Sequence, residues 1–301
     1  MRNVFCNTLL EFAANPAFVF LTGDLGFQAL EPLRNGMGGR FINTGVAEQN
    51  MVSVAAGLAK GGMRPWVYSI APFLYARALE QIRNDICLHG MPVILVGNGG
   101  GYGYGVMGST HHAIEDYGVL LSLPNIRVYL PAFDSDVREV IQYLMWADHP
   151  AYLRLGLSEQ PKWLSPLPFA PWRNLPPGAG PTIAIAGPLA GGILDALHQS
   201  GISADVWLVS ELPIAEPPAK FLASIRRSNY LLVVEEHVSA GSLGQMLSRQ
   251  LLLAGVVPGK FVHRTALGYV SGLYGSQRFH RAECGLDPAH IVADIARASL
   301  S

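Results

Sequence analysis

The sequence contains few cysteines, and they lie far apart. Cys6, Cys87 and Cys284 are the three in 301 residues, and no two of them form a C-x-x-C pair. Disulfide frameworks and cysteine-based zinc sites need several cysteines at short, regular spacings. The sequence therefore supports neither.

Charged residues are also scarce, at 14% of the chain, whereas soluble domains average about 25%. Lys plus Arg number 21 and Asp plus Glu number 22, which gives a net charge of -1. Without a basic excess we expect neither nucleic acid nor a membrane surface as a partner. The low charge, with a mean hydropathy of +0.26, fits either a large core or a surface that a partner chain covers.

Long apolar runs are missing as well. No run reaches the roughly 18 residues that a membrane-spanning helix requires. The N-terminal residues have no signal-peptide apolar segment, and Glu11 follows soon after them. We therefore expect a soluble, cytoplasmic protein.

What the sequence does contain is a regular alternation of short apolar runs and helical patterns. Continuous β-branched runs separated by helices indicate a parallel sheet that is buried on both faces. The expected strands are 18–22, 40–43, 65–69, 92–96, 125–130 and 151–155, and the expected helices are 47–60, 72–88, 113–122 and 134–147.

A proline-rich stretch divides the chain. Residues 161–181 hold seven of the 21 prolines, which excludes a helix or a central strand and indicates a linker. The α/β alternation then resumes, with strands at 182–186, 204–209, 230–235 and 260–263 and helices ending near 199 and at 217–226, 240–254 and 288–299. We predict two parallel-sheet α/β domains, 1–160 and 182–301, joined by the linker 161–181.

The segment Asn43–Asn50 places Glu48 in the first turn of a helix, directly after a strand. Ligands of open parallel sheets bind beyond the carboxyl ends of the strands. A carboxylate there is also favoured by the helix dipole. Glu48 is thus either a functional acid or an ordinary acid at a helix start.

A glycine-rich segment follows the expected strand 92–96. Seven of residues 97–108 are glycine, which permits positive φ and close approach of backbone to a ligand. Gly103, Gly105 and Gly108 match G-x-G-x-x-G, but no helix opens directly on that turn, so a dinucleotide site is not supported. His111 and His112 end the segment and suit either proton transfer or helix capping.

Taken in order, these motifs resemble the thiamine diphosphate enzymes of the transketolase family. The resemblance is carried by G-V-A-E-Q-N at 45–50, E-Q-I-R-N at 80–84, G-S-T-H at 108–111 with E-D at 115–116, and L-P-N-I-R-V-Y-L-P-A at 123–132. Beyond the linker, V-E-E-H at 234–237 with G-S-L-G at 241–244 looks like the family's C-terminal domain, as do Y-G-S at 274–276 and G-L-D at 285–287.

The resemblance starts at the pyrimidine-binding domain. The family's other cofactor domain, which binds the diphosphate through Mg²⁺ with a Gly-Asp-Gly…Asn motif, has no counterpart here, and no metal ligand is expected in this chain. Asp24 falls instead on the first strand end of the pyrimidine domain. The resemblance implies the smaller subunit of a split transketolase, in an α2β2 assembly with a large subunit that carries the diphosphate site.

The resemblance also implies roles for individual residues. Glu48 would hydrogen-bond a pyrimidine nitrogen and promote loss of the thiazolium proton, and the carbanion would take a two-carbon unit from a ketose as an enamine before transfer to an aldehyde. His111 would face the substrate. The remaining residues that would line the cofactor are Asp24, Leu25, Ile70, Phe73 and Tyr75.

Three departures bear on the substrate. Sugar-phosphate transketolases have an acid where this chain has Met107, a histidine where it has Gly99, and a phosphate-binding arginine where it has Leu157. Together with His112, Met107 and Gly99 are candidates to face the substrate, and Arg154 lies three residues before Leu157. These departures predict a sugar substrate that differs from a standard ketose phosphate.

Two alternatives remain from the sequence. One is the β-subunit of a 2-oxoacid dehydrogenase or decarboxylase, although the His-His and Gly-Ser-Thr pattern favours transketolase. The other is a non-catalytic partner protein, against which the presence of Glu48 and His111 argues.

Overall fold

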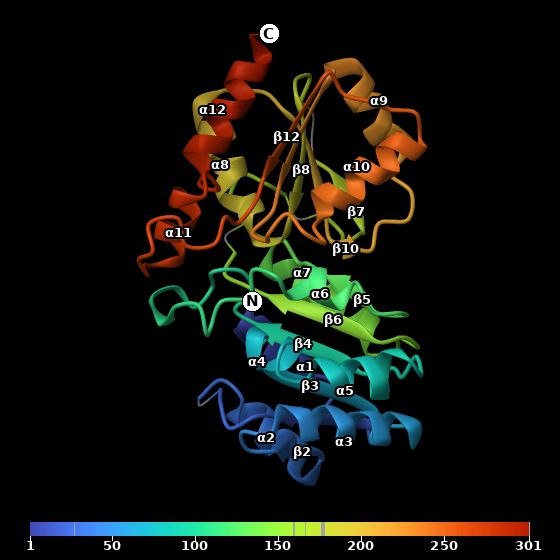
Figure 1. The fold of residues 1–301 in the computed structure, drawn as a ribbon. Helices are drawn as coiled ribbons and strands as arrows, with labels where there is room; N and C mark the ends of the chain where they lie inside the picture. Colours follow the sequence, from blue (N-terminus) through green and yellow to red (C-terminus); the bar gives the residue numbers. More distant parts are fainter. Residues whose placement is uncertain (27, 159, 166, 176–177, 301) are drawn as a thin grey trace.

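The computed structural model describes residues 1–26, 28–158, 160–165, 167–175 and 178–300. They form two stacked α/β parts, each with its own sheet, and the N-terminal part lies below the C-terminal part in Figure 1. The predicted fold class, two parallel-sheet α/β domains, is confirmed.

The first sheet has seven strands. Their order is β10 (Glu211–Leu212), β5 (Arg127–Tyr129), β6 (Ala151–Leu155), β4 (Ile94–Asn98), β3 (Arg64–Ile70), β1 (Phe18–Thr22) and β2 (Phe41–Asn43). All neighbouring strands pair in parallel except β10, which is antiparallel to β5. The carboxyl ends of β1 to β4 therefore meet at one edge.

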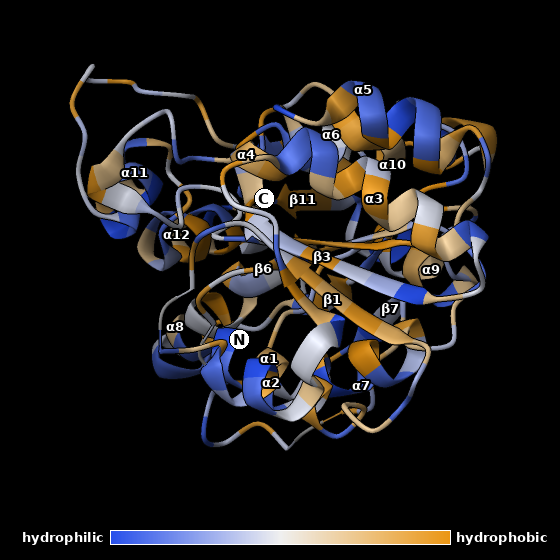
Figure 2. Cartoon of the chain, turned by 90° about the horizontal axis from the view of Figure 1, so that it is seen from below, coloured by the Kyte–Doolittle hydropathy of each residue, from blue (hydrophilic) through white to orange (hydrophobic). Residues whose placement is uncertain are grey.

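Helices cover both faces of this sheet, because alternate strand residues point to opposite sides. Phe18 and Phe20 belong to the core under α1 (Arg2–Leu10), α2 (Glu31–Met37) and α7 (Asp134–Leu144). Val19 and Leu21 belong to the core under α3 (Glu48–Lys60), α4 (Ala71–Tyr75), α6 (Asp116–Leu120) and the π-helical turn η2 (Ile82–Cys87). The short helix α5 (Leu79–Gln81) lies between α4 and η2 in the chain and adds no residue to this core. Figure 2 shows β1 and β3 between α1, α2 and α7 on one side and α3 on the other.

The second sheet has five strands, in the order β12 (Lys260–Arg264), β11 (Tyr230–Val234), β8 (Thr182–Ala186), β9 (Asp205–Val209) and β7 (Trp172–Asn174). One face packs on α8 (Ala190–Ser200) and α12 (Pro288–Ser299). The other packs on α9 (Ala219–Ser228) and α10 (Leu243–Leu253), in a core that continues into the first part. The remaining helical segments are α11 (Gln277–Glu283) and the 3-10 turns η1 (Gly38–Arg40), η3 (Gly105–Met107) and η4 (Gly187–Leu189).

The structure corrects several predicted elements. The expected helix 72–88 is divided into α4, α5 and η2, with a turn at 76–78. The expected helix 113–122 is shortened to α6, because Ala113 forms a two-way backbone bridge with Gly101 that holds it extended. The helices α1, α2 and α11 were not predicted from the sequence.

The predicted linker also contains structure. Within its described residues, Trp172–Asn174 form β7, an antiparallel edge strand beside β9. Edge strands tolerate neighbouring prolines because one side has no ladder to complete. The second part also contributes β10 to the first sheet, and the precise domain boundaries stay a prediction.

All three cysteines are buried and free. No helix among the described residues combines the length and apolar character needed to cross a bilayer.

Candidate functional site

The predicted cofactor residues gather at the edge where β1, β2 and β3 end. Asp24 follows β1, is exposed, and accepts a hydrogen bond from the Asn43 side chain at 3.1 Å. Its backbone N–H donates to the Gly45 carbonyl at 3.1 Å. Leu25, next along the chain, is half-buried. Backbone bonds between strand ends thus hold this corner in place.

Glu48 is the first residue of α3, and its side chain is almost fully buried. Its Oε1 accepts a hydrogen bond from the Ser69 hydroxyl at 3.2 Å, and its Oε2 accepts one from the Arg77 guanidinium at 2.6 Å. Ser69 lies near the end of β3, and Arg77 lies in the turn between α4 and α5. These bonds tie the carboxylate to the strand edge and not to the N–H groups of its own helix, which favours a functional acid over a helix-start acid.

A series of side-chain contacts links Glu48 to His111. The Arg77 guanidinium lies over the Phe73 ring, 4.9 Å from its centroid. Phe73 in turn meets the His111 ring edge-on, with centroids 5.1 Å apart. The Thr110 hydroxyl lies 2.9 Å from Nδ1 of His111. The structure therefore brings together an acid, a base and an aromatic ring that the sequence places in three different segments.

The other predicted cofactor residues lie close by, with different exposures. Ile70 is half-buried at the end of β3. Tyr75 is buried, and its hydroxyl donates to the Glu115 carboxylate at 3.3 Å. Burial raises the pKa of both Tyr75 and Glu115. Tyr75 is thus directed toward the segment before α6, and its place beside a cofactor stays a prediction.

The glycine-rich segment folds back on itself. Gly99 has a φ of +76°, and a Cβ there would lie 2.2 Å from the Tyr104 ring. A Cβ on Gly103 would meet the Gly99 backbone at 2.9 Å. These glycines allow close packing within the segment itself. Of the predicted substrate-facing residues, Gly99 is therefore covered by Tyr104, whereas Met107 is exposed.

His112, a candidate to face the substrate, makes its contacts with the glycine-rich segment and with the C-terminal part. It is buried, its Nε2 lies 2.8 Å from the Gly105 carbonyl, and its Nδ1 lies 2.9 Å from the Tyr269 hydroxyl. Since a carbonyl only accepts, the proton sits on Nε2 and Nδ1 accepts from Tyr269. His112 joins the glycine-rich segment to the C-terminal part.

Arg154 is likewise unavailable to a substrate in this chain. It is buried, donates to Asp116 at 2.8 Å and to the carbonyls of Ala113 and Glu236. Its guanidinium also lies over the Tyr117 ring. Arg154 therefore connects the N-terminal part of the chain, through Ala113, to the C-terminal part, through Glu236.

The V-E-E-H segment at 234–237 also connects the two parts of the chain. Glu235 accepts hydrogen bonds from His263, from Tyr117 and from the first N–H groups of α10. Burial alone would raise the pKa of Glu235, but these hydrogen bonds outweigh it and lower the pKa. Glu236 accepts from the Tyr102 N–H and from Arg281. These acids hold the two parts together.

Arg77 contacts the buried Glu48 carboxylate, and sequence reasoning gave it no role. It lies in the segment after the expected strand 65–69, but no local signal gave it a role, because its contact with Glu48 joins residues 29 positions apart. Its proximity to a buried carboxylate is visible only once α3 and the turn after α4 are placed on the same edge.

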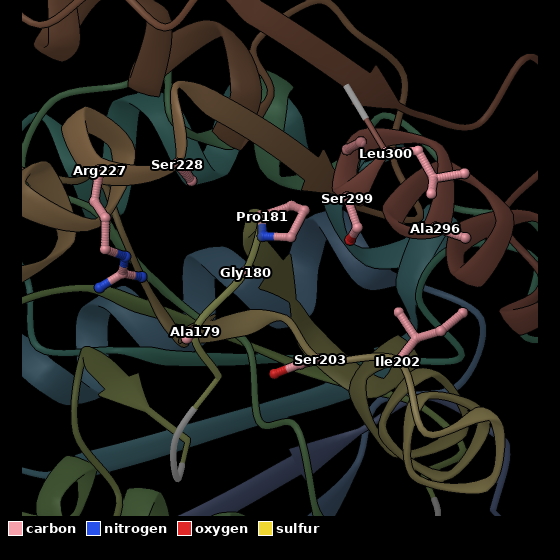
Figure 3. A pocket seen from close by; sticks show the side chains of 11 residues that line it. Ala179, Gly180, Pro181, Ile202, Ser203, Arg227, Ser228, Ala296, Ser299 and Leu300 are labelled. Carbon is pink, nitrogen blue, oxygen red and sulfur yellow. The ribbon is translucent and has the colours of Figure 1, made fainter.

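A separate cavity of about 690 Å³ lies at the end of the second sheet where β8 and β9 begin (Figure 3). Its walls come from the segments before β8 and β9 and from the ends of α9 and α12, and they include Pro181, Ser203, Arg227 and Ser299. Arg227 is already paired with Asp205 at 2.7 Å. No predicted site residue is among the residues that line this cavity. Within the described part of the chain, no cluster of three metal-ligating side chains is found.

Comparisons with known proteins agree on one family. Residues 6–161 match the family described as transketolase, pyrimidine binding domain. A subunit of the apulose-4-phosphate transketolase of Actinobacillus succinogenes is 32% identical over 259 residues, which cover 84% of this chain and 83% of that protein. The 1-deoxy-D-xylulose-5-phosphate synthase 2 of Geobacter sulfurreducens is 31% identical over 289 residues, which cover 92% of this chain and 44% of that protein.

A solved structure extends the similarity to the whole chain. It is described as a split gene transketolase, an inactive beta4 tetramer, and it superimposes with a TM-score of 0.82 at 29% identity. The match covers 99% of this chain and 97% of that one. Both parts of the present chain therefore have counterparts in a single split subunit.

Proposed function

Since the chain belongs to the transketolase family, as the small subunit of a split enzyme, we propose that it works with a partner subunit to move a two-carbon ketol unit from a ketose to an aldehyde. The observation that carries this proposal is the buried Glu48 carboxylate at the strand edge, linked through Arg77 and Phe73 to His111.

The residues at this edge fit the aminopyrimidine of thiamine diphosphate, the cofactor that the family implies. A flat heterocycle with ring nitrogens and an exocyclic amine needs a hydrogen-bonding acid, an aromatic face and apolar walls. Glu48 supplies the first, Phe73 the second, and Ile70 and Leu25 the third. When bound, the cofactor supplies a thiazolium carbon that carries the two-carbon unit.

In this proposal Glu48 would hydrogen-bond a ring nitrogen of the cofactor through a carboxyl oxygen. Its burial strengthens any hydrogen bond that it makes, because the local dielectric constant is low. Ser69 orients one carboxylate oxygen, and Arg77 balances the charge of the other. Without such a partner, a buried carboxylate is costly.

His111 exchanges protons with the substrate. Thr110 fixes one ring nitrogen, which orients the other for a substrate hydroxyl. An imidazole can change charge near neutral pH, and this group therefore serves in general as both donor and acceptor of a proton. Phe73 holds the ring in place and separates it from Arg77.

We propose that a larger partner subunit supplies the diphosphate site and its Mg²⁺, in an α2β2 assembly. The inactive state of the beta4 tetramer and the description of the curated relative as a subunit support the need for a partner. Large exposed apolar side chains also support it. They are Val46 after β2, Leu157 after β6, Val106 and Met107 in the glycine-rich segment, and Leu273 and Tyr274 in the C-terminal part. Accordingly, the isolated chain should bind thiamine diphosphate weakly in calorimetry, and micromolar affinity would contradict the assembly.

The substrate of this proposal is a sugar that differs from the common ketose phosphates. The curated relative's name specifies apulose 4-phosphate. This supports specialised sugar chemistry, although that relative's substrate still carries a phosphate. The name transketolase also favours ketol transfer over the 2-oxoacid alternative.

Glu48→Gln, tested in the complex with the partner subunit, decides the proposal. The amide keeps the shape of the side chain but cannot carry the proton, so turnover should fall by at least ~10²-fold at saturating cofactor. Glu80→Gln, an exposed acid on α5, is the matched control and should retain wild-type turnover. Near-normal turnover in Glu48→Gln, or no ketol transfer by the wild-type complex, would overturn the proposal.

A further inference from the structure

The glycine-rich segment is anchored at both of its ends. Gly99 and Gly100 donate backbone hydrogen bonds to the Leu155 carbonyl. At the other end, the Gly105 carbonyl accepts from His112, and a Cβ on Gly105 would meet the backbone of Gly275 to Gln277. The residues between these anchors are therefore held in one conformation.

Tyr104 lies between the two anchors and packs flat against Gly99. A Cβ on Gly99 would come within 2.2 Å of Cε2 and 2.4 Å of Cδ2 of the Tyr104 ring. The Tyr104 hydroxyl accepts a hydrogen bond from the Asn98 amide at 2.8 Å. Only glycine at position 99 leaves room for this ring, and the hydroxyl contact fixes its orientation.

The same ring borders His111. The Tyr104 and His111 centroids lie 5.9 Å apart, and Phe73 stands against His111 at 5.1 Å. The imidazole thus lies next to two aromatic rings. Tyr104 is half-buried, so part of its ring remains open at this edge.

We infer that Tyr104 is a specificity-determining residue, whose ring limits the length of the sugar chain that is accommodated beside His111. This inference rests on the proposed function and names the residue that sets its substrate range. The ring fills the space at Gly99, where any side chain would displace it. The hydrogen bond from Asn98 and the contact with Gly99 favour this one position of the ring, in which it excludes longer chains sterically.

The test measures selectivity in the complex with the partner subunit, using hydroxypyruvate, L-erythrulose and D-fructose as donors of increasing length. Tyr104→Ala should raise kcat/KM for fructose relative to hydroxypyruvate by about 10-fold or more, the scale on which pocket volume discriminates substrates. Tyr104→Phe keeps the ring and separates its contribution from that of the hydroxyl. Tyr143→Ala removes a half-exposed tyrosine of α7 and should keep the wild-type ratio.

A second measurement does not depend on activity. In thermal unfolding of the chain, Gly99→Ala should lower the midpoint strongly in the wild-type background and less in Tyr104→Ala, because the added methyl group then meets no ring. If Tyr104→Ala does not fold, Tyr104→Leu replaces it in both experiments.

The outcomes separate this inference from the proposed function. An active wild-type complex with an unchanged donor ratio in Tyr104→Ala would overturn the inference alone, even if the unfolding data couple residues 99 and 104. Equal shifts in Tyr104→Phe and Tyr104→Ala would also overturn it, since the ring would then not be responsible. A wild-type complex without turnover on any donor would overturn the proposed function and this inference with it.

Discussion

Arg77 donates a hydrogen bond of 2.6 Å to Glu48 from a side chain that is 42% exposed, whereas the glutamate side chain is only 3% exposed. Arg77, which balances the charge of the buried carboxylate, thus approaches Glu48 from the solvent side. Such a partner can move without disturbing the core. Arg77 thus contacts one carboxylate oxygen of Glu48 from the solvent side, while the Ser69 hydroxyl contacts the other from within the protein.

Replacing Arg77 should weaken the proposed chemistry more than the fold. We expect Arg77→Met to lower turnover of the two-subunit enzyme by about 10-fold or more, because a positioned hydrogen bond to the proposed acid is lost. Glu48 is buried but the Arg77 side chain is 42% exposed, so water can replace the guanidinium beside the carboxylate. The cost in unfolding free energy should therefore lie between the ~1 kcal/mol of an exposed pair and the ~3–5 kcal/mol of a fully buried one.

Steady-state kinetics and urea unfolding of the same variants measure both effects. Arg83→Met removes an exposed arginine of the neighbouring η2 turn and serves as the control. Equal turnover in Arg77→Met and Arg83→Met would show that Arg77 has no part in positioning Glu48.

Local sequence patterns were sufficient for most of the strands and for Glu48. A carboxylate at a helix start after a strand is visible within eight residues, and β1, β6 and β8 begin and end where the apolar runs do. What the sequence did not show are contacts between distant segments. The strand β10 exists only because residues 211–212 meet β5.

The two adjacent histidines show the same limit. His111 meets Phe73, whereas His112 points to Tyr269, 157 residues further along the chain. Neighbouring residues of an irregular segment point in different directions, and only the packed C-terminal part determines which one is buried. The roles of His112 and Arg154 therefore could not be read from their positions in the sequence.

His112 should make the stability of the chain depend on pH. Burial lowers the pKa of His112 from its usual value of 6.5. Between pH 6.5 and the lower pKa of the folded state, His112 binds a proton in the unfolded chain but not in the folded chain. The contribution of neutral His112 to stability is therefore fully present above pH 6.5 and is lost as the pH falls toward the folded pKa. Protonation of Nδ1 would also oppose the hydrogen bond from Tyr269.

Thermal midpoints between pH 7.5 and 5.5 test this expectation. His112→Asn, which has a donor and an acceptor but no titration, should lower the midpoint at pH 7.5 and flatten its pH dependence. His89→Asn, at an exposed position, should leave the slope unchanged. An unaltered slope in His112→Asn would contradict the prediction. The pKa values of His237 and His280 are also lowered by burial, and these two residues account for a remaining slope.

Arg154 should prove structural when it is replaced. Arg154→Met leaves Asp116 buried without its counter-ion, which typically costs about 3–5 kcal/mol of unfolding free energy. Arg138→Met, which breaks an exposed pair with Glu11, should cost at most about 1 kcal/mol. Urea unfolding measures both. If Arg154→Met were instead as stable as wild type and raised KM for the sugar, the arginine would be a substrate ligand.

We expect the substrate range to depend on the three replaced positions at the edge of the proposed site. Leu157 is 68% exposed and uncharged, Met107 is also exposed, and Tyr104 covers Gly99. A phosphate is bound best by charge-assisted hydrogen bonds, and an apolar side chain beside it carries a desolvation cost. We therefore expect the reconstituted enzyme to use xylulose 5-phosphate and fructose 6-phosphate poorly, and an unphosphorylated ketose better. Steady-state kinetics beside an ordinary transketolase measure this difference. A specificity constant for xylulose 5-phosphate equal to that of the control enzyme would show that the partner subunit supplies the missing cation.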